Sequence, residues 1–484
     1  MMKLQALATL LAIVASTEAT GLNQRHAHLA HRQASPASSA TSAASSASAS
    51  GSVPPASGAS SAATGAATAA VPTGATAATT DPLFTLTAAT SDVPPLGQIS
   101  SGMPTGTPWQ ASTTYQAGAQ PTFSNAPPLP APFVFSPSVW PPQDKVPPTD
   151  SNEVKAWLKE LDGWNIPNIP LNVDNTCASN PQAAQDAAKN GWWTCGGHTR
   201  STDIVQCPDK MTWGVSFDDG PSEYSKKLLK FLDQKNLSAT FFVVGSRVIS
   251  RPDILRDEYM AGHEISVHTW SHTALTTLSN EQIVAELGWT RKAIKDVLGV
   301  TPTTMRPPYG DMDDRVRAIS LAMGMIPISW TTAPNGATFD TFDWRVAGGL
   351  VSAPVQYRTF QDILGNASTM NNGFIVLQHD LYEISVDLAV GFTLDAALTH
   401  NPPFTLKPIG ECSKIPTSNL YLESNTNKTF PFTNSSAANG GADVNGDGKP
   451  DTKSGTGSSN SAFIVSPVTA YSLAGFAALG AILL

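Results

Sequence analysis

Basic residues are few in this 484-residue chain, with 29 lysines and arginines against 38 acidic residues and a formal charge of −9. They form no visible stripe, which argues against nucleic acid as a partner. The four cysteines include no Cys-x-x-Cys pair, so a zinc site built from cysteines is disfavoured. The absence of a Gly-x-Ser-x-Gly motif likewise disfavours a serine hydrolase.

Aromatic and charged side chains are sparse in residues 20–131, which are dominated by alanine, serine, threonine, glycine and proline. Such a segment cannot bury enough apolar surface to offset its ordering entropy, so we predict a disordered, O-glycosylated stalk. The core-forming residues are concentrated after it. They predict an extension over 132–206, which packs on a main domain over 207–412.

Both ends of the chain resemble targeting signals. Residues 1–19 contain Lys3, an apolar run and small residues, which predicts a secretory signal peptide. A polar linker over 413–461 precedes an apolar, uncharged tail over 462–484. This tail is typical of a GPI-attachment signal, with attachment between Ser454 and Asn460; a plain tail anchor is the alternative. We therefore expect a secreted protein that is anchored at the plasma membrane.

An even number of cysteines in a secreted chain predicts disulfides, with three pairings open. Cys207 precedes the first expected core strand and Cys412 follows the last expected helix, so we favour a Cys207–Cys412 bond. Cys177 and Cys195 would then close a loop in the extension.

Surface features of a secreted protein are also present. N-glycosylation sequons begin at four asparagines: Asn236, Asn366, Asn427 and Asn434. Residues Asp443 to Asp451 have the spacing of an EF-hand-type calcium loop through its ninth position. Because Ser454 stands where a bidentate glutamate belongs, a polar loop is favoured over a calcium site.

From residue 211 onward, short apolar segments alternate with amphipathic ones. The strands are expected over 212–217, 238–245, 264–268, 303–306, 326–330 and 373–378. The helices are expected over 222–235, 251–261, 279–298, 313–323, 355–368 and 386–398. This α/β alternation predicts a parallel sheet with right-handed crossovers, and nearly seven units favour a barrel over a doubly wound sheet.

Two adjacent carboxylates follow the first of these strands, in Val215-Ser-Phe-Asp218-Asp219-Gly-Pro221. The strand would deliver Asp218 and Asp219 to the carboxyl edge of the sheet, where such folds keep their chemistry. Neighbouring carboxylates repel each other when half-buried, so they require a cation, a proton or an arginine. A solvated Asp-Asp-Gly turn is the alternative interpretation.

A second motif, His268-Thr-Trp-Ser-His272, follows the strand over 264–268. Histidines four residues apart can face one metal ion, although surface histidines at this spacing are common. No glutamate follows the first histidine, which excludes the zinc metalloprotease motif. Asp219 is available as a third ligand, and such a set leaves positions open for water and substrate.

The segment Arg306-Pro-Pro-Tyr309-Gly310 also follows a strand. Its two prolines make a stiff bend that would hold Arg306 beside the acidic pair and offer the Tyr309 backbone N–H to the cavity.

Leu377-Gln-His379-Asp closes the last expected strand. His379 is the candidate general acid, and an aspartate from Asp340-Thr-Phe-Asp343-Trp344 could orient it. Both Asp340 and Asp343 remain open for this role.

These motifs, in this order, resemble those of the NodB-homology polysaccharide deacetylases of the carbohydrate esterase 4 type, and most closely the fungal chitin deacetylases. The resemblance covers residues 211–410. It implies a distorted (β/α) barrel and a divalent metal, with zinc expected and cobalt as an alternative.

The resemblance also implies roles for individual residues. Asp218 would be the catalytic base, His379 the acid, Arg306 the residue that steers the base, and Asp343 the support of His379. Asp219, His268 and His272 would bind the metal. The residues that would contact the substrate are Tyr309, Trp344 and Leu377.

The implied activity is metal-dependent hydrolysis of the N-acetyl groups of chitin to chitosan and acetate at the cell wall. An O-acetyl esterase of the xylan type would share the same residues and barrel. A catalytically inactive chitin-binding wall protein is the alternative from another functional class.

Overall fold

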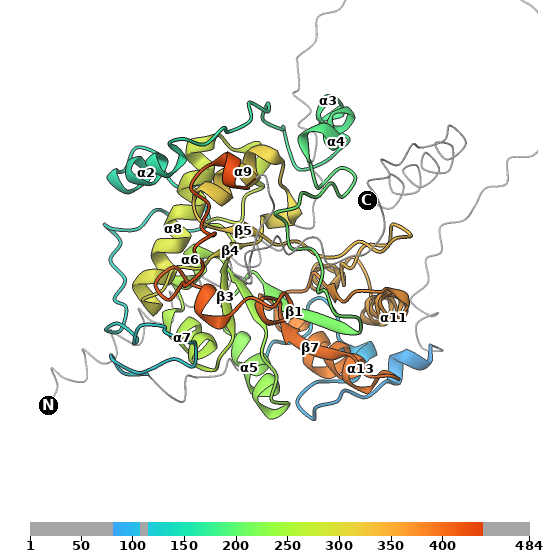
Figure 1. The fold of residues 1–484 in the computed structure, drawn as a ribbon. Coiled ribbons are helices and arrows are strands. Elements are labelled where there is room, and N and C mark those ends of the chain that lie inside the picture. Colours follow the sequence, from blue (N-terminus) through green and yellow to red (C-terminus); the bar gives the residue numbers. More distant parts are fainter. Residues whose placement is uncertain (1–80, 107–114, 439–484) are drawn as a thin grey trace, which may run out of the picture. The chain divides into compact units, whose positions relative to one another are not determined.

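The computed structural model describes residues 81–106 and 115–438, and the fold below is that of the unit Thr85–Ala462 (Figure 1). In the described residues, seven parallel strands form one sheet in the order β5-β4-β3-β2-β1-β6, and β7 also pairs with β1. The strands are β1 (Thr212–Asp218), β2 (Thr240–Val243), β3 (Glu264–Val267), β4 (Thr304–Met305), β5 (Ile326–Pro327), β6 (Phe374–Ile375) and β7 (Thr405–Pro408).

Helices connect these strands, as the sequence predicted. The main helices are α5 (Ser225–Gln234), α7 (Pro252–Met260), α8 (Asn280–Leu298), α9 (Asp314–Ala322), α11 (Ala353–Thr369), α12 (Glu383–Leu388) and α13 (Leu394–Thr399). The shorter ones are α2 (Asn152–Trp157), α3 (Pro181–Gln185), α4 (Ala187–Asn190), α6 (Gly245–Val248), α10 (Asp343–Ala347), α14 (Ile409–Cys412) and α15 (Ser435–Ala438). A π-helical turn joins α12 to α13 where the sequence predicted one continuous helix.

The longest helix, α8, shows how local signals define these elements. Ser279 accepts a hydrogen bond from the Gln282 backbone, and the Gln282 side chain accepts one from the Ser279 backbone, which forms a capping box. The helix ends at Gly299, whose φ of 84° is the left-handed conformation that glycine adopts at little cost.

The barrel closes irregularly between β5 and β6. Pro327 ends β5 and has no N–H to donate, and the regular ladder stops there. Backbone hydrogen bonds then run from Ile204 to Pro327 and from Thr331 to Ile375. Beyond β5 and β6, the predicted strands over 326–330 and 373–378 therefore continue only as isolated backbone hydrogen bonds and bridges. Ile204 of the extension fills part of the gap between them.

The strand β7 is absent from the sequence prediction. It lies beside β1 in Figure 1 and pairs with its first half, from Thr212 opposite Thr405 to Val215 opposite Pro408. Its four residues include Lys407 and end in a proline, a composition that sequence patterns assign to loops.

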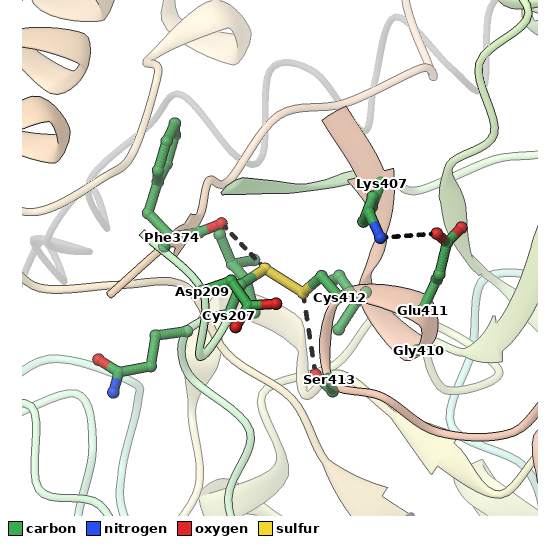
Figure 2. Close-up of a disulfide and its surroundings, with 12 residues drawn as sticks. Cys207, Asp209, Phe374, Lys407, Gly410, Glu411, Cys412 and Ser413 are labelled. Carbon is green, nitrogen blue, oxygen red and sulfur yellow. Dashed lines mark hydrogen bonds and ion pairs between the residues drawn. A yellow bond between two sulfur atoms is a disulfide. The ribbon is translucent and has the colours of Figure 1, made fainter. Parts of the chain in front are cut away.

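A disulfide between Cys207 and Cys412 ties the residues before β1 to α14 (Figure 2). Its sulfur atoms pack on Gly214 of β1, where an added Cβ atom would lie 2.9 Å from Cys207 Sγ. A second disulfide joins Cys177 to Cys195 in the extension. These are the two pairings favoured from the sequence.

Replacing both Cys207 and Cys412 with alanine is expected to lower the free energy of unfolding by about 5 kcal/mol, because their sequence separation is 205 residues. The matched Cys177/Cys195 double variant, with a separation of 18 residues, is expected to lose about 3 kcal/mol. Denaturant unfolding of both variants measures this. An unchanged free energy of unfolding in the Cys207/Cys412 variant would contradict the predicted stabilisation by this disulfide.

The flanks of the barrel differ from the predicted stalk and linker in the described residues. In 85–106 and 115–131, several apolar side chains are buried: Val93, Leu96, Ile99, Phe123 and Leu129. Beyond Cys412, Tyr421 is fully buried, and its hydroxyl accepts a hydrogen bond from the Ile265 backbone. A few scattered apolar residues are enough to bury these flanks, because they pack against apolar residues of the barrel.

Several predictions fall outside the described residues: the signal peptide, the calcium-type loop, the GPI-attachment region and the apolar tail. Within the described part, no helix is both long and apolar enough to cross a membrane. Of the four sequon asparagines, Asn236 is exposed and the other three are half-buried, and their glycosylation stays a prediction.

Candidate active site

The carboxyl ends of four strands bring the predicted site residues together. Asp218 ends β1 and Asp219 follows it, His268 follows β3, and Arg306 follows β4. The acid candidate His379, in the segment after β6, forms a backbone bridge with Asp218. Residues distant in sequence thus meet at the edge of the sheet where the sequence predicted the chemistry.

Asp219, His268 and His272 form a compact buried cluster. Asp219 Oδ1 lies 3.0 Å from His272 Nε2 and 3.4 Å from His268 Nε2. One potential ligand atom from each residue lies within 4.8 Å of the others. The three side chains therefore offer two nitrogens and one oxygen to a common point.

The chemistry of this cluster fits a divalent metal ion. His268 Nδ1 lies 2.7 Å from the Arg306 carbonyl oxygen, which can only accept, so Nδ1 carries the proton. His268 Nε2 then faces Asp219 Oδ1, a buried atom without a hydrogen-bond partner among the described residues. Two imidazole nitrogens and a buried carboxylate oxygen form a donor set that suits zinc-like ions.

The backbone around the cluster is held in an unusual conformation. Asp219 and His272 have φ angles of 79° and 58°, in the left-handed region that side-chain-bearing residues rarely adopt. Arg247 Nη1 donates to the Asp219 carbonyl at 2.7 Å and lies 3.7 Å from its carboxylate. Burial alone would raise the pKa of Asp219, but its histidine partners and Arg247 hold that pKa well below its ordinary value.

Glu286 on α8, which the sequence analysis missed, supports the loop between the two histidines. Its carboxylate accepts hydrogen bonds from the Trp270 and Ser271 backbones at 2.8 and 2.9 Å, and from the Ser271 hydroxyl at 2.5 Å. It is fully buried, and burial raises its pKa to about 7. The only sequence feature that could have identified Glu286 is its position, as a single glutamate on the apolar face of a helix.

Changing Glu286→Gln is expected to weaken zinc binding about 10- to 100-fold, because a neutral amide oxygen accepts the Trp270 and Ser271 backbone N–H groups more weakly than a carboxylate does, and the amide NH₂ replaces the oxygen that accepts from the Ser271 hydroxyl. Titration of zinc against a competing chelator measures the affinity. Glu281→Gln, at an exposed position of the same helix, is the matched control. A folded Glu286→Gln protein with wild-type zinc affinity would show that Glu286 does not position the ligands.

The base candidate Asp218 is paired with a buried arginine. Asp218 Oδ1 lies 2.6 Å from Arg306 Nη1, which also donates to Ser216 at 3.0 Å. The Arg306 guanidinium lies 4.0 Å from the centre of the Phe242 ring. Asp218 therefore stays outside the Asp219–histidine contacts, with its second oxygen 3.9 Å from His268 Nε2.

The acid candidate His379 is paired with Asp343. His379 Nδ1 lies 2.8 Å from Asp343 Oδ1, and the His379 backbone N–H donates to Oδ2 at 2.8 Å. Burial would lower the pKa of His379, but the Asp343 charge outweighs it and raises the pKa to about 10. Asp340 instead accepts from the Phe342 backbone, so the hydrogen-bonded partner of His379 is Asp343.

The three predicted substrate contacts surround this centre. The Tyr309 side chain is 41% exposed, its ring lies 4.8 Å from that of His272, and its φ is 61°. Trp344 is half-buried and follows Asp343, to which its backbone donates. Leu377 is buried next to the His379 segment.

Comparisons with known proteins show which family the sequence resembles. The sequence model of the family described as polysaccharide deacetylase matches residues 205–328. The chain is 50% identical over 341 residues to chitin deacetylase 1 of Cryptococcus neoformans var. grubii, covering 70% of this chain and 72% of that protein. It is 33% identical over 281 residues to the chitin deacetylase of Amylomyces rouxii, covering 53% of this chain and 63% of that one.

Among solved structures, the chitin deacetylase of Colletotrichum lindemuthianum is similar, with a TM-score of 0.40 and 26% identity. That similarity covers 48% of this chain and 99% of the other.

Proposed function

This chain belongs to the polysaccharide deacetylase family, and on that premise we propose that it hydrolyses the N-acetyl groups of chitin to acetate and chitosan. The observation that supports this most strongly is the pairing of each candidate group with its own partner. Arg306 Nη1 lies 2.6 Å from Asp218 Oδ1, and Asp343 Oδ1 lies 2.8 Å from His379 Nδ1 and raises the pKa of His379 to about 10. A base and an acid thus flank the cluster that fits a metal ion.

The metal ion proposed for Asp219, His268 and His272 is zinc, with cobalt as the alternative. Two imidazole nitrogens and one carboxylate are a common catalytic zinc set. Bound there, the ion would supply acidification of water and polarisation of the acetamide carbonyl.

The protein's own groups then carry the proton transfers. Asp218 accepts the proton of the attacking water, and the Tyr309 backbone N–H donates to the oxygen on which negative charge develops. His379 gives its proton to the amide nitrogen as the carbon–nitrogen bond breaks. The products are acetate and the free amine of a glucosamine unit.

The proposed location is outside the cell, at the plasma membrane and cell wall through a GPI anchor. The charged, then apolar N-terminus and the uncharged apolar C-terminal tail support this. An enzyme anchored there would have access to the chitin polymer of the cell wall.

The activity is tested by assaying acetate release from chitooligosaccharides and from acetylated xylan, each with and without a chelator. We expect chelator-sensitive release from the chitooligosaccharides. Preferential release from xylan would instead identify an O-acetyl esterase. No release from any substrate by zinc- or cobalt-saturated protein would favour the inactive, chitin-binding alternative.

A further inference from the structure

The extension before the barrel brings a tryptophan to the rim of the candidate active site. The Trp193 backbone donates to the Met312 carbonyl at 2.9 Å, and its ring centre lies 4.5 Å from that of Trp330. An added Cβ atom on Gly310 would lie 2.3 Å from Trp193 Cζ3. The indole therefore lies directly on the backbone of the loop that carries Tyr309.

A buried carboxylate fixes the position of this tryptophan. Asp311 Oδ1 accepts hydrogen bonds from the Trp192 indole and the Thr194 hydroxyl, both at 2.9 Å. Its other oxygen accepts from the Thr276 backbone at 3.0 Å and from the Thr276 hydroxyl at 2.6 Å. Trp193 thus lies between two residues that are anchored to the site loops, next to the disulfide-bonded Cys195.

Trp193 packs against the core cluster that contains Trp330, but it is less deeply buried than the neighbouring tryptophan rings. Trp192 and Trp330 are only 2% and 6% exposed, whereas Trp193 is half-buried and keeps part of its surface open. Tyr309, on the same loop as Gly310, is 41% exposed beside the metal-ligand candidate His272. Trp193 therefore lies against Gly310, the neighbour of Tyr309, and the Tyr309 ring contacts the metal-ligand candidate His272.

We propose that Trp193 is a specificity-determining residue that contacts the sugar ring next to the one being deacetylated. Sugar rings present apolar C–H surface, which packs favourably on a large rigid aromatic ring, and a half-buried indole offers such a surface without a large entropy cost. Trp193 lies outside residues 205–328, the range matched by the family. The inference rests on the proposed function, because it takes an N-acetylhexosamine oligomer as the ligand.

Two substitutions separate a sugar contact from a packing role. Trp193→Phe keeps an aromatic ring, whereas Trp193→Leu keeps apolar contact with Trp330 and Gly310 but removes the aromatic face. We expect the leucine variant to raise the KM for chitopentaose by about two- to tenfold, the usual range for losing one aromatic contact. The phenylalanine variant is expected to retain most of the wild-type KM.

Calorimetric binding of chitopentaose to the zinc-loaded full chain, with Asp218→Asn added to every variant to stop hydrolysis, gives a second readout that does not require turnover. The expected result is weaker binding by the leucine variant than by the phenylalanine variant. Trp164→Leu, at another half-buried tryptophan of the extension, is the matched control and should bind as the wild type does.

The outcomes separate this inference from the proposed function. If the wild type binds chitopentaose without releasing acetate, deacetylation fails while the variants still test Trp193. Wild-type affinity in the leucine variant would overturn the inference, as would equal losses in both variants. Failure of the wild type to bind chitopentaose would overturn it as well.

Discussion

Asp218→Asn is expected to lower kcat for acetate release from chitooligosaccharides by about 10²- to 10⁴-fold while zinc binding persists. The amide cannot accept the proton of the attacking water. The proposed metal ligands stay in place because Asp219, and not Asp218, makes the close contacts with His272 and His268. Acetate release and bound zinc, measured on the same preparation, test both halves of this prediction.

His268→Ala is the matched comparison, because it removes a proposed ligand and leaves the Asp218–Arg306 pair intact. It is expected to lose both zinc and activity. The two variants therefore separate a base from a ligand at neighbouring positions of one site. Wild-type turnover in Asp218→Asn would exclude Asp218 as the base.

Asp343→Asn is expected to move the alkaline limb of the activity profile to lower pH. In the wild type, His379 with a pKa of about 10 stays protonated through neutral pH, and its acid function is lost only as the pH rises through that value. Without the Asp343 charge, burial lowers the pKa of His379 and only the charges of Asp219 and Asp218 still raise it, so the pKa falls from its wild-type value. The variant should therefore lose roughly tenfold or more in kcat at pH 8 while falling less at pH 5.

A profile of kcat from pH 5 to pH 10 measures this shift, and an NMR titration of His379 reports its pKa directly. Asp340→Asn is the control, because Asp340 hydrogen-bonds to the Phe342 backbone and not to His379. An alkaline limb at the same pH in wild type and Asp343→Asn would show that Asp343 does not set the protonation of His379.

Much of the site could be predicted because its residues occur in short motifs at strand ends. The parallel alternation placed Asp218, His268, Arg306 and His379 at one edge, and the structure brings them together there. The choice between Asp340 and Asp343 could not be made from spacing alone. It depends on how the loop turns before α10, where Phe342 has a φ of 56°.

The missed features depend on contacts between residues distant in sequence. Glu286 and Asp311 are single acidic residues whose roles come from backbone N–H groups on other loops. The strand β7 forms only because β1 offers a free edge over its first half. The disorder of the flanks was predicted from composition. Composition does not reveal that Leu96 and Phe123 are buried in the fold.

The central claim is that a metal ion held by Asp219, His268 and His272 enables amide hydrolysis. The most direct measurement is a zinc titration of metal-free protein, with acetate release from chitopentaose followed at each addition. We predict no release without metal, and full activity as zinc approaches one equivalent per chain in the wild type but not in His268→Ala. Acetate release at the full rate by protein shown to be metal-free would contradict the claim.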